Sequence, residues 1–422
     1  MSAHHRWLFA CSAATAILAG CTGGQPPLAV PGSGAASSHV RAGQASSTEK
    51  VLFNFTGGND GGNAATGLVL DHQGNLYGST VIGGTYTCGT VFKLAPQNSV
   101  PWTESVLYNF DCYATGKNPH GGVTFDPSGN LEGTTVSGGT GGYCTGDGCG
   151  VVYKLAGSSE TVRYNFTGGG DGFGPGGAVV FDRRGNAFGT APDGGASYQG
   201  VIYEISRAGK QRVLHAFTGG KDGGVGSLGS LLLDKSGKIY GVTELGGAQS
   251  SGTVYELSPA GNNKWHLRTL YAFKGTPDAG FPYGGLVADK SGNLYGTTYY
   301  GGAHGVGSVF ELVRKKNGKY HERVLYSFQG GSDGSYTTST LIFGASGDLY
   351  GTTSSGGGTC DCGTIFKVDP ASGAEQVLHN FGSGTDGAYP YYGLTADQSG
   401  NFYGATVAGG SFGQGVVFEF TP

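Results

Sequence analysis

A five-residue motif that ends in phenylalanine recurs seven times in this chain and constrains its fold more than any other feature. Successive copies start 51 to 56 residues apart. They read VLFNF at Val51, VLYNF at Val106, VRYNF at Val162, VLHAF at Val213, TLYAF at Thr269, VLYSF at Val324 and VLHNF at Val377. A regular period of about this length is typical of solenoids, propellers and repeat arrays. The repeat therefore predicts one domain over residues 51–422, where a chain of 422 residues would otherwise suggest two or three.

Each unit contains four short apolar runs separated by turn signals. In the first unit the runs cover residues 51–55, 67–71, 75–80 and 89–94. Runs of five or six aromatic and β-branched residues are strand signals, and they are too short for helices. Apolar residues occupy both parities, as in TVF at 90–92, which predicts strands covered on both faces. Four-stranded sheets stacked face to face, one for each period, describe a β-propeller.

The second and third runs are joined by a recurrent turn pattern, Asp-x-x-Gly-Asn. Glycine supplies the positive φ of a tight hairpin, and the aspartate accepts hydrogen bonds from its own turn. We therefore expect these aspartates to form turns. The pattern starts at Asp71, Asp126, Asp182, Asp289 and Asp397; Asp234 keeps it with Lys238 in last place, and Gly344 replaces the aspartate in the sixth unit.

Composition excludes several other classes of protein. Glycine is 86 of 422 residues but has no Gly-X-Y period, which excludes collagen. Aromatic residues make up 12 %, which is too much apolar surface for a disordered chain. Charged residues are only 13 % and the formal net charge is −4, without a basic stripe, so we expect no nucleic-acid partner.

Residues 1–20 read as a secretory signal, with Arg6 before an apolar stretch from Trp7 to Leu18. The sequence LAGC at 18–21 resembles a bacterial lipobox. That resemblance implies lipidation of Cys21 and a membrane anchor, and Thr22 in place of Asp implies the outer membrane. An ordinary signal peptide followed by a chance cysteine is the alternative. Residues 21–50, rich in Gly, Ser, Ala and Pro, are predicted to be a flexible tether.

The order of the motifs GLVxDxxGNLY and GTVFKL is similar to that in propellers of the NHL type, in which the first run forms the innermost strand. On that phasing Val51–Phe55 is an outermost strand, and it completes a sheet with 393–397, 401–406 and 415–420. Such closure removes the free edges of an open array. We therefore predict an all-β, seven-bladed propeller of four-stranded antiparallel blades, closed by strand 51–55.

The recurrent motifs LYxFxGGxDG, GNLYGTT and GTVFKL resemble the GloVer repeat of bacterial choice-of-anchor tandem repeat proteins. The resemblance covers residues 51–422. It implies an extracytoplasmic protein whose anchor is the lipobox, and it implies no reaction and no cofactor.

Two sets of loops should emerge at one face of this propeller, and they vary most between units. Variable loops on a rigid scaffold commonly carry binding sites. Aromatic rings beside carboxylates suit a glycan, although the aromatics could instead pack beneath the loops and the aspartates could only form turns. The candidate ligand-binding residues are Asp60, Asp171, Asp222, Asp278, Asp333, Asp386, Tyr283, Tyr299, Tyr300, Tyr391 and Tyr392. Other aromatics of these loops are Tyr86, Tyr143, Tyr198, Phe281, Tyr389 and Phe412.

Signals for an enzyme or a metal site are weak. HExxH, GxSxG, P-loop and EF-hand patterns do not occur in the sequence. His215 and His379 occupy positions held by tyrosine in other units and are predicted to be structural substitutes. Glu132 replaces an aromatic of a strand, and in a packed sheet it would need a partner. A functional role is one interpretation of it, and drift at a partly exposed edge is the other.

The six cysteines of the repeat domain predict disulfides in an exported protein. Cys88 precedes one strand and Cys112 follows its neighbour, so these two should pair, and Cys144 should pair with Cys149 within one loop. Cys360 and Cys362 would close a very small ring, which leaves a free pair or a redox role open.

Taken together, these features predict a monomeric, surface-anchored binding module for a glycan or a protein. A glycan hydrolase or lyase with carboxylates at the channel mouth, or a purely structural envelope protein, are the alternatives.

Overall fold

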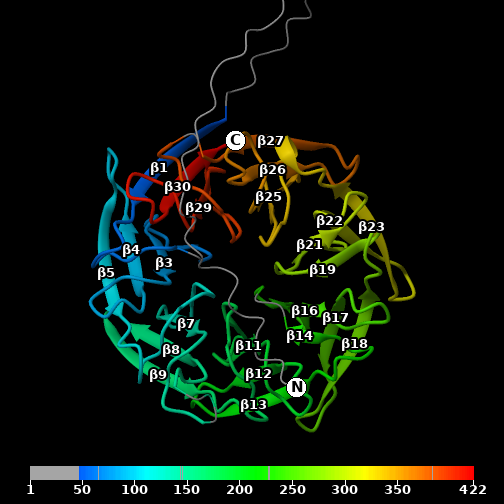
Figure 1. The fold of residues 1–422 in the computed structure, drawn as a ribbon. Coiled ribbons are helices and arrows are strands. Elements are labelled where there is room, and N and C mark those ends of the chain that lie inside the picture. The colour runs from blue at the N-terminus through cyan, green and yellow to red at the C-terminus, as the bar shows by residue number, and fades with distance from the viewer. Residues whose placement is uncertain (1–46, 65, 143, 145, 227–228, 383) are drawn as a thin grey trace, which may run out of the picture. The chain divides into compact units, whose positions relative to one another are not determined.

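The computed structural model describes residues 47–422, except 65, 143, 145, 227–228 and 383. The predicted signal peptide, Cys21 and most of the predicted tether lie outside these residues. The described part is one compact unit whose regular elements are all β-strands apart from one 3-10 turn (Figure 1). Its seven antiparallel sheets form a seven-bladed propeller, as the repeat predicted. In the described residues no helix is long and apolar enough to span a bilayer.

Blade 1 shows the common plan. It contains β2 (Val69–Leu70), β3 (Leu76–Thr80), β4 (Thr90–Ala95) and β5 (Thr103–Asn109), hydrogen-bonded in that order from the inside outwards. The predicted runs are confirmed, although the innermost strand is shorter than its run. The turn chemistry is confirmed as well, since Asp71 accepts the backbone N–H groups of Gln73 and Asn75 at 2.8 and 2.9 Å.

The next five blades repeat this order, and in blades 4 and 5 the innermost position is divided between two short strands that both pair with the following strand. Blade 2 contains β6 (Val123–Phe125), β7 (Leu131–Thr135), β8 (Val151–Ala156) and β9 (Ser159–Asn165); blade 3 contains β10 (Val180–Phe181), β11 (Ala187–Ala191), β12 (Val201–Ile205) and β13 (Gln211–Ala216). Blade 4 contains β14 (Gly224–Gly226), β15 (Leu232–Leu233), β16 (Ile239–Leu245), β17 (Thr253–Pro259) and β18 (Trp265–Ala272). Blade 5 contains β19 (Ala279–Pro282), β20 (Val287–Ala288), β21 (Leu294–Gly301), β22 (Ser308–Arg314) and β23 (Tyr320–Ser327). Blade 6 contains β24 (Ile342–Phe343), β25 (Leu349–Thr353), β26 (Thr364–Val368) and β27 (Glu375–Asn380), and a 3-10 turn, η1 (Gly331–Asp333), precedes it.

Blade 7 closes the ring with strands from both ends of the domain. Its sheet has the order β1-β30-β29-β28, in which β1 (Thr48–Asn54) pairs with β30 (Val416–Thr421). The two remaining strands are β29 (Phe402–Ala405) and β28 (Thr395–Ala396). The predicted closure is therefore confirmed, and β1 begins three residues earlier than the predicted strand.

The core between blades is built from the last residue of each pentapeptide. Phe55 is fully buried, and its ring packs edge-on against that of Phe92 in the next blade, with centroids 5.1 Å apart. Equivalent pairs occur at all seven blade boundaries, at 5.0 to 5.4 Å. Gly78 makes room for the ring, because a Cβ there would lie 2.6 Å from Phe92. Each buried phenylalanine contributes about 1.5–3 kcal/mol to folding.

The antiparallel blades divide the loops between two faces. We call loop-rich face the one that carries the connections from each outermost strand to the next blade and those between the second and third strands. The opposite turn face carries the Asp-x-x-Gly-Asn turns and the connections from third to fourth strands.

Candidate functional site

The six candidate aspartates of the loop-rich face are held within their own loops. Asp171 accepts the Tyr164 hydroxyl at 2.9 Å, the Thr167 backbone N–H at 2.9 Å and the Thr167 hydroxyl at 2.5 Å. The other five accept the backbone N–H at the same position, four residues before the aspartate, at 2.8 to 3.2 Å. They are Asp60, Asp222, Asp278, Asp333 and Asp386. The structure thus gives them the turn-forming role, while a part in ligand binding stays a prediction.

The second unit, which lacks this aspartate, uses the same bond in reverse. There Asp111 stands at the threonine position and Thr115 at the aspartate position. The Asp111 carboxylate accepts the Thr115 hydroxyl at 2.9 Å and the Thr115 backbone N–H at 3.0 Å. A fixed loop shape, and not a charge at one position, is therefore what all seven units share.

The two histidines that replace tyrosine act as structural substitutes, as predicted. Tyr271 and Tyr326 donate their hydroxyls to Asp278 and Asp333 at 2.9 and 2.8 Å. At the same positions His215 Nε2 lies 3.0 Å from Asp222, and His379 Nε2 lies 3.1 Å from Asp386. Both rings reproduce the tyrosine contact with the loop.

One residue in each of these loops has a left-handed backbone. It lies three positions after the loop aspartate or its equivalent, with φ between 51° and 68°. Its N–H bonds at 2.7 to 3.2 Å to a carbonyl oxygen in a loop of the preceding blade. The seven residues are Asn63, Asn118, Gly174, Val225, Phe281, Tyr336 and Tyr389. Asparagine and glycine suit this conformation, whereas the aromatic side chains and the β-branched Val225 are strained in it.

The three aromatic members occupy consecutive loops, which enter blades 5, 6 and 7. Strained backbone of this kind clusters at functional sites. Tyr336 is absent from the residues that the sequence singled out. Its signal was available, since it stands third after Asp333 as Phe281 and Tyr389 stand third after Asp278 and Asp386.

Five aromatic rings on this face are linked by ring contacts into one group, which we call the aromatic patch. It consists of Phe281, Tyr283, Tyr299, Tyr300 and Tyr336. Tyr299 stacks on Tyr336, with centroids 5.0 Å apart and planes at 30°. It contacts Tyr300 edge-on at 4.7 Å and Tyr283 at 6.3 Å, and Phe281 contacts Tyr300 at 5.6 Å. Tyr300 is 45 % exposed and the other four are half-buried, so the patch presents ring surface to solvent.

Neighbouring groups give the aromatic patch a polar edge. Burial, followed by the charges of nearby phenols and of Glu244 at the end of β16, raises the pKa of Tyr283. Burial, followed by the charges of neighbouring phenols such as Tyr391, raises the pKa of Tyr299 to about 12. The loop that carries Tyr391 and Tyr392 is held in place, because the Thr352 hydroxyl donates to the Tyr392 carbonyl oxygen at 3.3 Å. Groups from blades 4 to 7 thus meet at this patch.

The remaining loop aromatics do not join this group. Tyr86, Tyr198 and Phe412 belong to blades 1, 3 and 7 and are 55 %, 73 % and 59 % exposed. No ring contact links them to the patch in the described part of the chain. Tyr143 lies outside the described residues. Within residues 47–422, apart from the gaps noted above, no group of three or more His, Cys, Asp or Glu side chains could hold a metal ion.

Three disulfides brace the same face. Cys88 pairs with Cys112, and Cys144 pairs with Cys149, so both predicted bonds are confirmed. Cys360 pairs with Cys362, the pairing that the sequence left open. Disulfides of this number are typical of proteins that fold in an oxidising compartment, which indicates an extracytoplasmic location.

Glu132 lies in the interior of blade 2 and not at an exposed edge. Only 1 % of its side chain is exposed, and it forms an ion pair with Arg163, while Lys154 Nζ lies 4.0 Å away. Burial raises the pKa of Glu132, and the bond to Arg163 opposes this. The edge interpretation is therefore wrong, and the expectation that a buried carboxylate needs a partner is confirmed. Removal of one partner would leave an unpaired buried charge, at a cost of about 3–5 kcal/mol.

The partner of Glu132 was visible in the pentapeptide. The second residue is leucine in six copies and arginine, Arg163, only in the copy of blade 2. Blade 2 thus has an ion pair, Glu132 with Arg163, where the other blades have an aromatic residue and a leucine.

Comparisons with known proteins agree with this fold. The family model of the Gloeobacter/Verrucomicrobia repeat matches residues 144–342 and 229–422, which together make up more than half of the chain. The chain belongs to this family. A search of curated proteins gives no match.

Two solved structures are similar to this chain at low sequence identity. A fungal alcohol oxidase of the AA5 family, in complex with copper, is 13 % identical and has a TM-score of 0.53; the alignment covers 88 % of this chain and 75 % of that one. A gluconolactonase from Xanthomonas campestris is 14 % identical over 78 % of this chain and 89 % of that one, with a TM-score of 0.42. The similarity to the oxidase concerns the fold alone.

Proposed function

We propose that this protein is an extracytoplasmic binding module that takes a glycan on its aromatic patch. The observation that carries the proposal is the contact of Tyr299 with three other tyrosines on the loop-rich face. Stacked and edge-on rings offer flat apolar surface for the C–H faces of sugar rings. Phenol groups and the carboxylate of Glu244 can exchange hydrogen bonds with the sugar hydroxyls.

The strained backbone supports the same assignment. Phe281 and Tyr336 are kept at φ 57°, where four equivalent loops have asparagine, glycine or valine. A rigid loop that is held by a bond to the preceding blade presents its ring without losing further conformational freedom when a ligand binds. Preorganisation of this kind raises affinity by lowering the entropic cost of binding.

We expect Tyr299→Ala to weaken glycan binding about tenfold or more, because central, partly buried aromatics carry most of the binding energy of such sites. The experiment is a glycan array probed with the full chain, followed by calorimetric titration of the strongest hit. Tyr198→Ala is the matched control, since Tyr198 is an exposed loop tyrosine of blade 3 outside the patch. Equal losses in the two variants would contradict the assignment. Binding to a protein from the envelope, without binding to any glycan, would make the patch a protein-binding surface instead.

We also propose that the protein is exported and anchored to the outer membrane by lipid on Cys21. The LAGC sequence at 18–21 and the three disulfides support this. Two or three acyl chains anchor a protein stably where one does so marginally. We expect Cys21→Ser to move the protein from the membrane fraction to the soluble fraction. Mass spectrometry of the N-terminal peptide provides the second readout, and an unmodified Cys21 in membrane-bound protein would disprove the anchor.

A further inference from the structure

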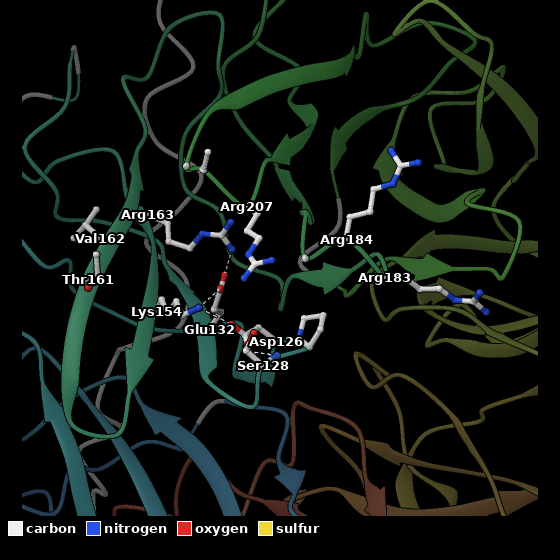
Figure 2. Close-up of a pocket in the computed structure, with 14 residues that line it drawn as sticks. Asp126, Ser128, Glu132, Lys154, Thr161, Val162, Arg163, Arg183, Arg184 and Arg207 are labelled. Carbon is white, nitrogen blue, oxygen red and sulfur yellow. Dashed lines mark hydrogen bonds and ion pairs between the residues drawn. The ribbon is translucent and has the colours of Figure 1, made fainter.

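A pocket on the turn face lies between blades 2 and 3, away from the aromatic patch. Its volume is about 390 Å³, and its lining brings together the side chains of four arginines, one lysine and two carboxylates. The cations are Lys154, Arg163, Arg183, Arg184 and Arg207, and the carboxylates are Asp126 and Glu132 (Figure 2). Five positive charges against two negative ones make the pocket strongly basic in a chain whose net charge is −4.

The pocket exists where blade 2 departs from the repeat. In blade 1, Tyr77 occupies the position of Glu132, and its ring packs against Phe125 of the next blade at 5.3 Å. In blade 5, Tyr295 packs against Phe343 in the same way at 5.4 Å. At the blade 2 boundary Glu132 is shorter than these rings and Arg163 replaces leucine. The crevice that aromatic side chains fill elsewhere is therefore polar here.

The two carboxylates are already neutralised by the two deeper cations. Glu132 pairs with Arg163, and Asp126 accepts Lys154 Nζ at 2.6 Å. Arg163 also donates to the Ser206 carbonyl oxygen at 2.7 Å, which fixes its guanidinium against blade 3. This inner layer leaves the charge of the outer arginines uncompensated.

The three outer arginines have exposed side chains without an ion pair among the described residues. Arg184 and Arg207 use their backbone N–H groups, which bond to Asp182 at 2.9 Å and to Asn186 at 3.2 Å. These bonds hold the backbone at the rim and leave the guanidinium groups available. In Figure 2, Arg207 is directed towards the inner layer, while Arg183 and Arg184 extend outwards along the rim.

We propose that this pocket binds a phosphate-class oxyanion, as a phosphate or sulfate ester or as a phosphate headgroup of a lipid. Arg207 makes the contact, and Arg183 and Arg184 contribute positive charge at the rim. Guanidinium groups suit this ligand because their planar N–H donors match the geometry of tetrahedral oxyanions. The buried Glu132–Arg163 pair is a positioning element that keeps the crevice open and polar. The site is independent of glycan binding on the opposite face.

The first experiment titrates inorganic phosphate, and then sulfate, into the full chain carrying Cys21→Ser, so that no lipid is attached. We expect saturable binding that weakens with added sodium chloride, because charge attraction at an exposed rim is screened by salt. Arg207→Gln should weaken it about tenfold. The matched control is Arg314→Gln in blade 5, since the Arg314 backbone N–H bonds to Asn293 at 2.9 Å as that of Arg207 bonds to Asn186. The blade boundary beside Arg314 keeps its apolar residues, Tyr240 and Leu270.

A double variant tests the origin of the pocket. Glu132→Tyr with Arg163→Leu restores the pair found in five of the other blades and should fill the crevice, so we expect binding to be lost while the melting temperature is kept. A second arm offers vesicles of phosphatidylglycerol, with phosphatidylcholine vesicles for comparison. Binding to the free anion alone indicates a soluble ester, and binding to phosphatidylglycerol vesicles alone indicates a lipid headgroup. Equal effects of Arg207→Gln and Arg314→Gln, unchanged binding in the folded double variant, or no binding in either arm would each overturn the proposal. Glycan binding, measured on the same Arg207→Gln protein, should not change.

Discussion

Deletion of residues 48–55 is expected to abolish cooperative folding of the propeller or to lower its melting temperature drastically. The deleted segment contains β1, whose register with β30 extends from Thr48–Thr421 to Asn54–Val416. It also removes Leu52 and Phe55, both fully buried. Two such side chains contribute about 3–6 kcal/mol, before the loss of the strand ladder is counted. A whole domain is stable by only about 5–15 kcal/mol.

Calorimetry or circular dichroism on heating measures this effect. A chain without residues 22–46 provides the control, because these residues precede β1 and should not change the melting temperature. If the variant without residues 48–55 melts like the intact chain, blade 7 does not depend on β1 and the closure carries no stability.

The second large effect is a dependence of the melting temperature on pH. In five blades a glutamate of the outermost strand lies near an aspartate of the loop that leads into the same blade. Burial, reinforced by the charge of a nearby aspartate, raises the pKa of each of five glutamates to about 7. They are Glu49, Glu104, Glu160, Glu322 and Glu375, and their neighbours are Asp386, Asp60, Asp111, Asp278 and Asp333. One carboxyl oxygen of each glutamate is buried without a hydrogen-bond partner. Protonation relieves both the repulsion and the unpaired charge.

The sign of the effect follows from the raised pKa values. Between pH 4.5, the ordinary pKa of a glutamate, and about pH 7, the folded state binds more protons at these glutamates than the unfolded state. The stabilisation is therefore fully present below pH 4.5 and is lost as pH rises to about 7. Because the glutamates are partly exposed, it amounts to about 1 kcal/mol each. Two histidines have the opposite effect on stability. Burial lowers the pKa of His120 to about 4 and also lowers the pKa of His379, so both favour the folded state at higher pH. We expect the melting temperature to be several degrees higher at pH 5 than at pH 8.

Blade 3 supplies the variant that tests this. Gln211 stands where five other blades have the glutamate, and its amide donates to the Asp171 carbonyl oxygen at 3.3 Å. Glu104→Gln should therefore raise the melting temperature at pH 8 and leave it unchanged at pH 5. The reciprocal variant, Gln211→Glu, should lower it at pH 8 only. A melting temperature that is independent of pH from 5 to 8, in the wild type and both variants, would show that the acid pairs do not matter.

Much of the fold could be predicted because it is encoded locally and repeated. The strands, the Asp71-type turns and the closure by β1 follow from apolar period, turn residues and the phase of the repeat, and each unit confirms the others. The disulfide between Cys88 and Cys112 followed as well, because both residues flank strands that are neighbours in sequence. The equivalence of His215 and tyrosine was visible for the same reason.

The candidate site was only half visible. The sequence identified Tyr299 and Tyr300. The aspartates that it placed beside them accept hydrogen bonds within their own loops instead. Tyr336 was recognised as part of the patch by its ring contacts with Tyr299 and Tyr300 in the structure. Contacts between neighbouring blades, such as that of Tyr299 with Tyr336, join residues of different repeats, and no spacing rule specifies which side chains meet there.

The sequence by itself thus determined how many blades there are, how each blade is built and how the ring closes, because these follow from the number and phase of the repeats and from the apolar runs and turn residues within each one. Only the tertiary structure decided which side chains of separate strands and loops meet. It placed Arg163 against Glu132, Glu104 against Asp60, and Tyr299 against Tyr336. The physical reason is that burial and charge at such contacts depend on side chains from several strands and loops at once. A single changed residue, such as Glu132, acquires its meaning only when the facing residue is in place.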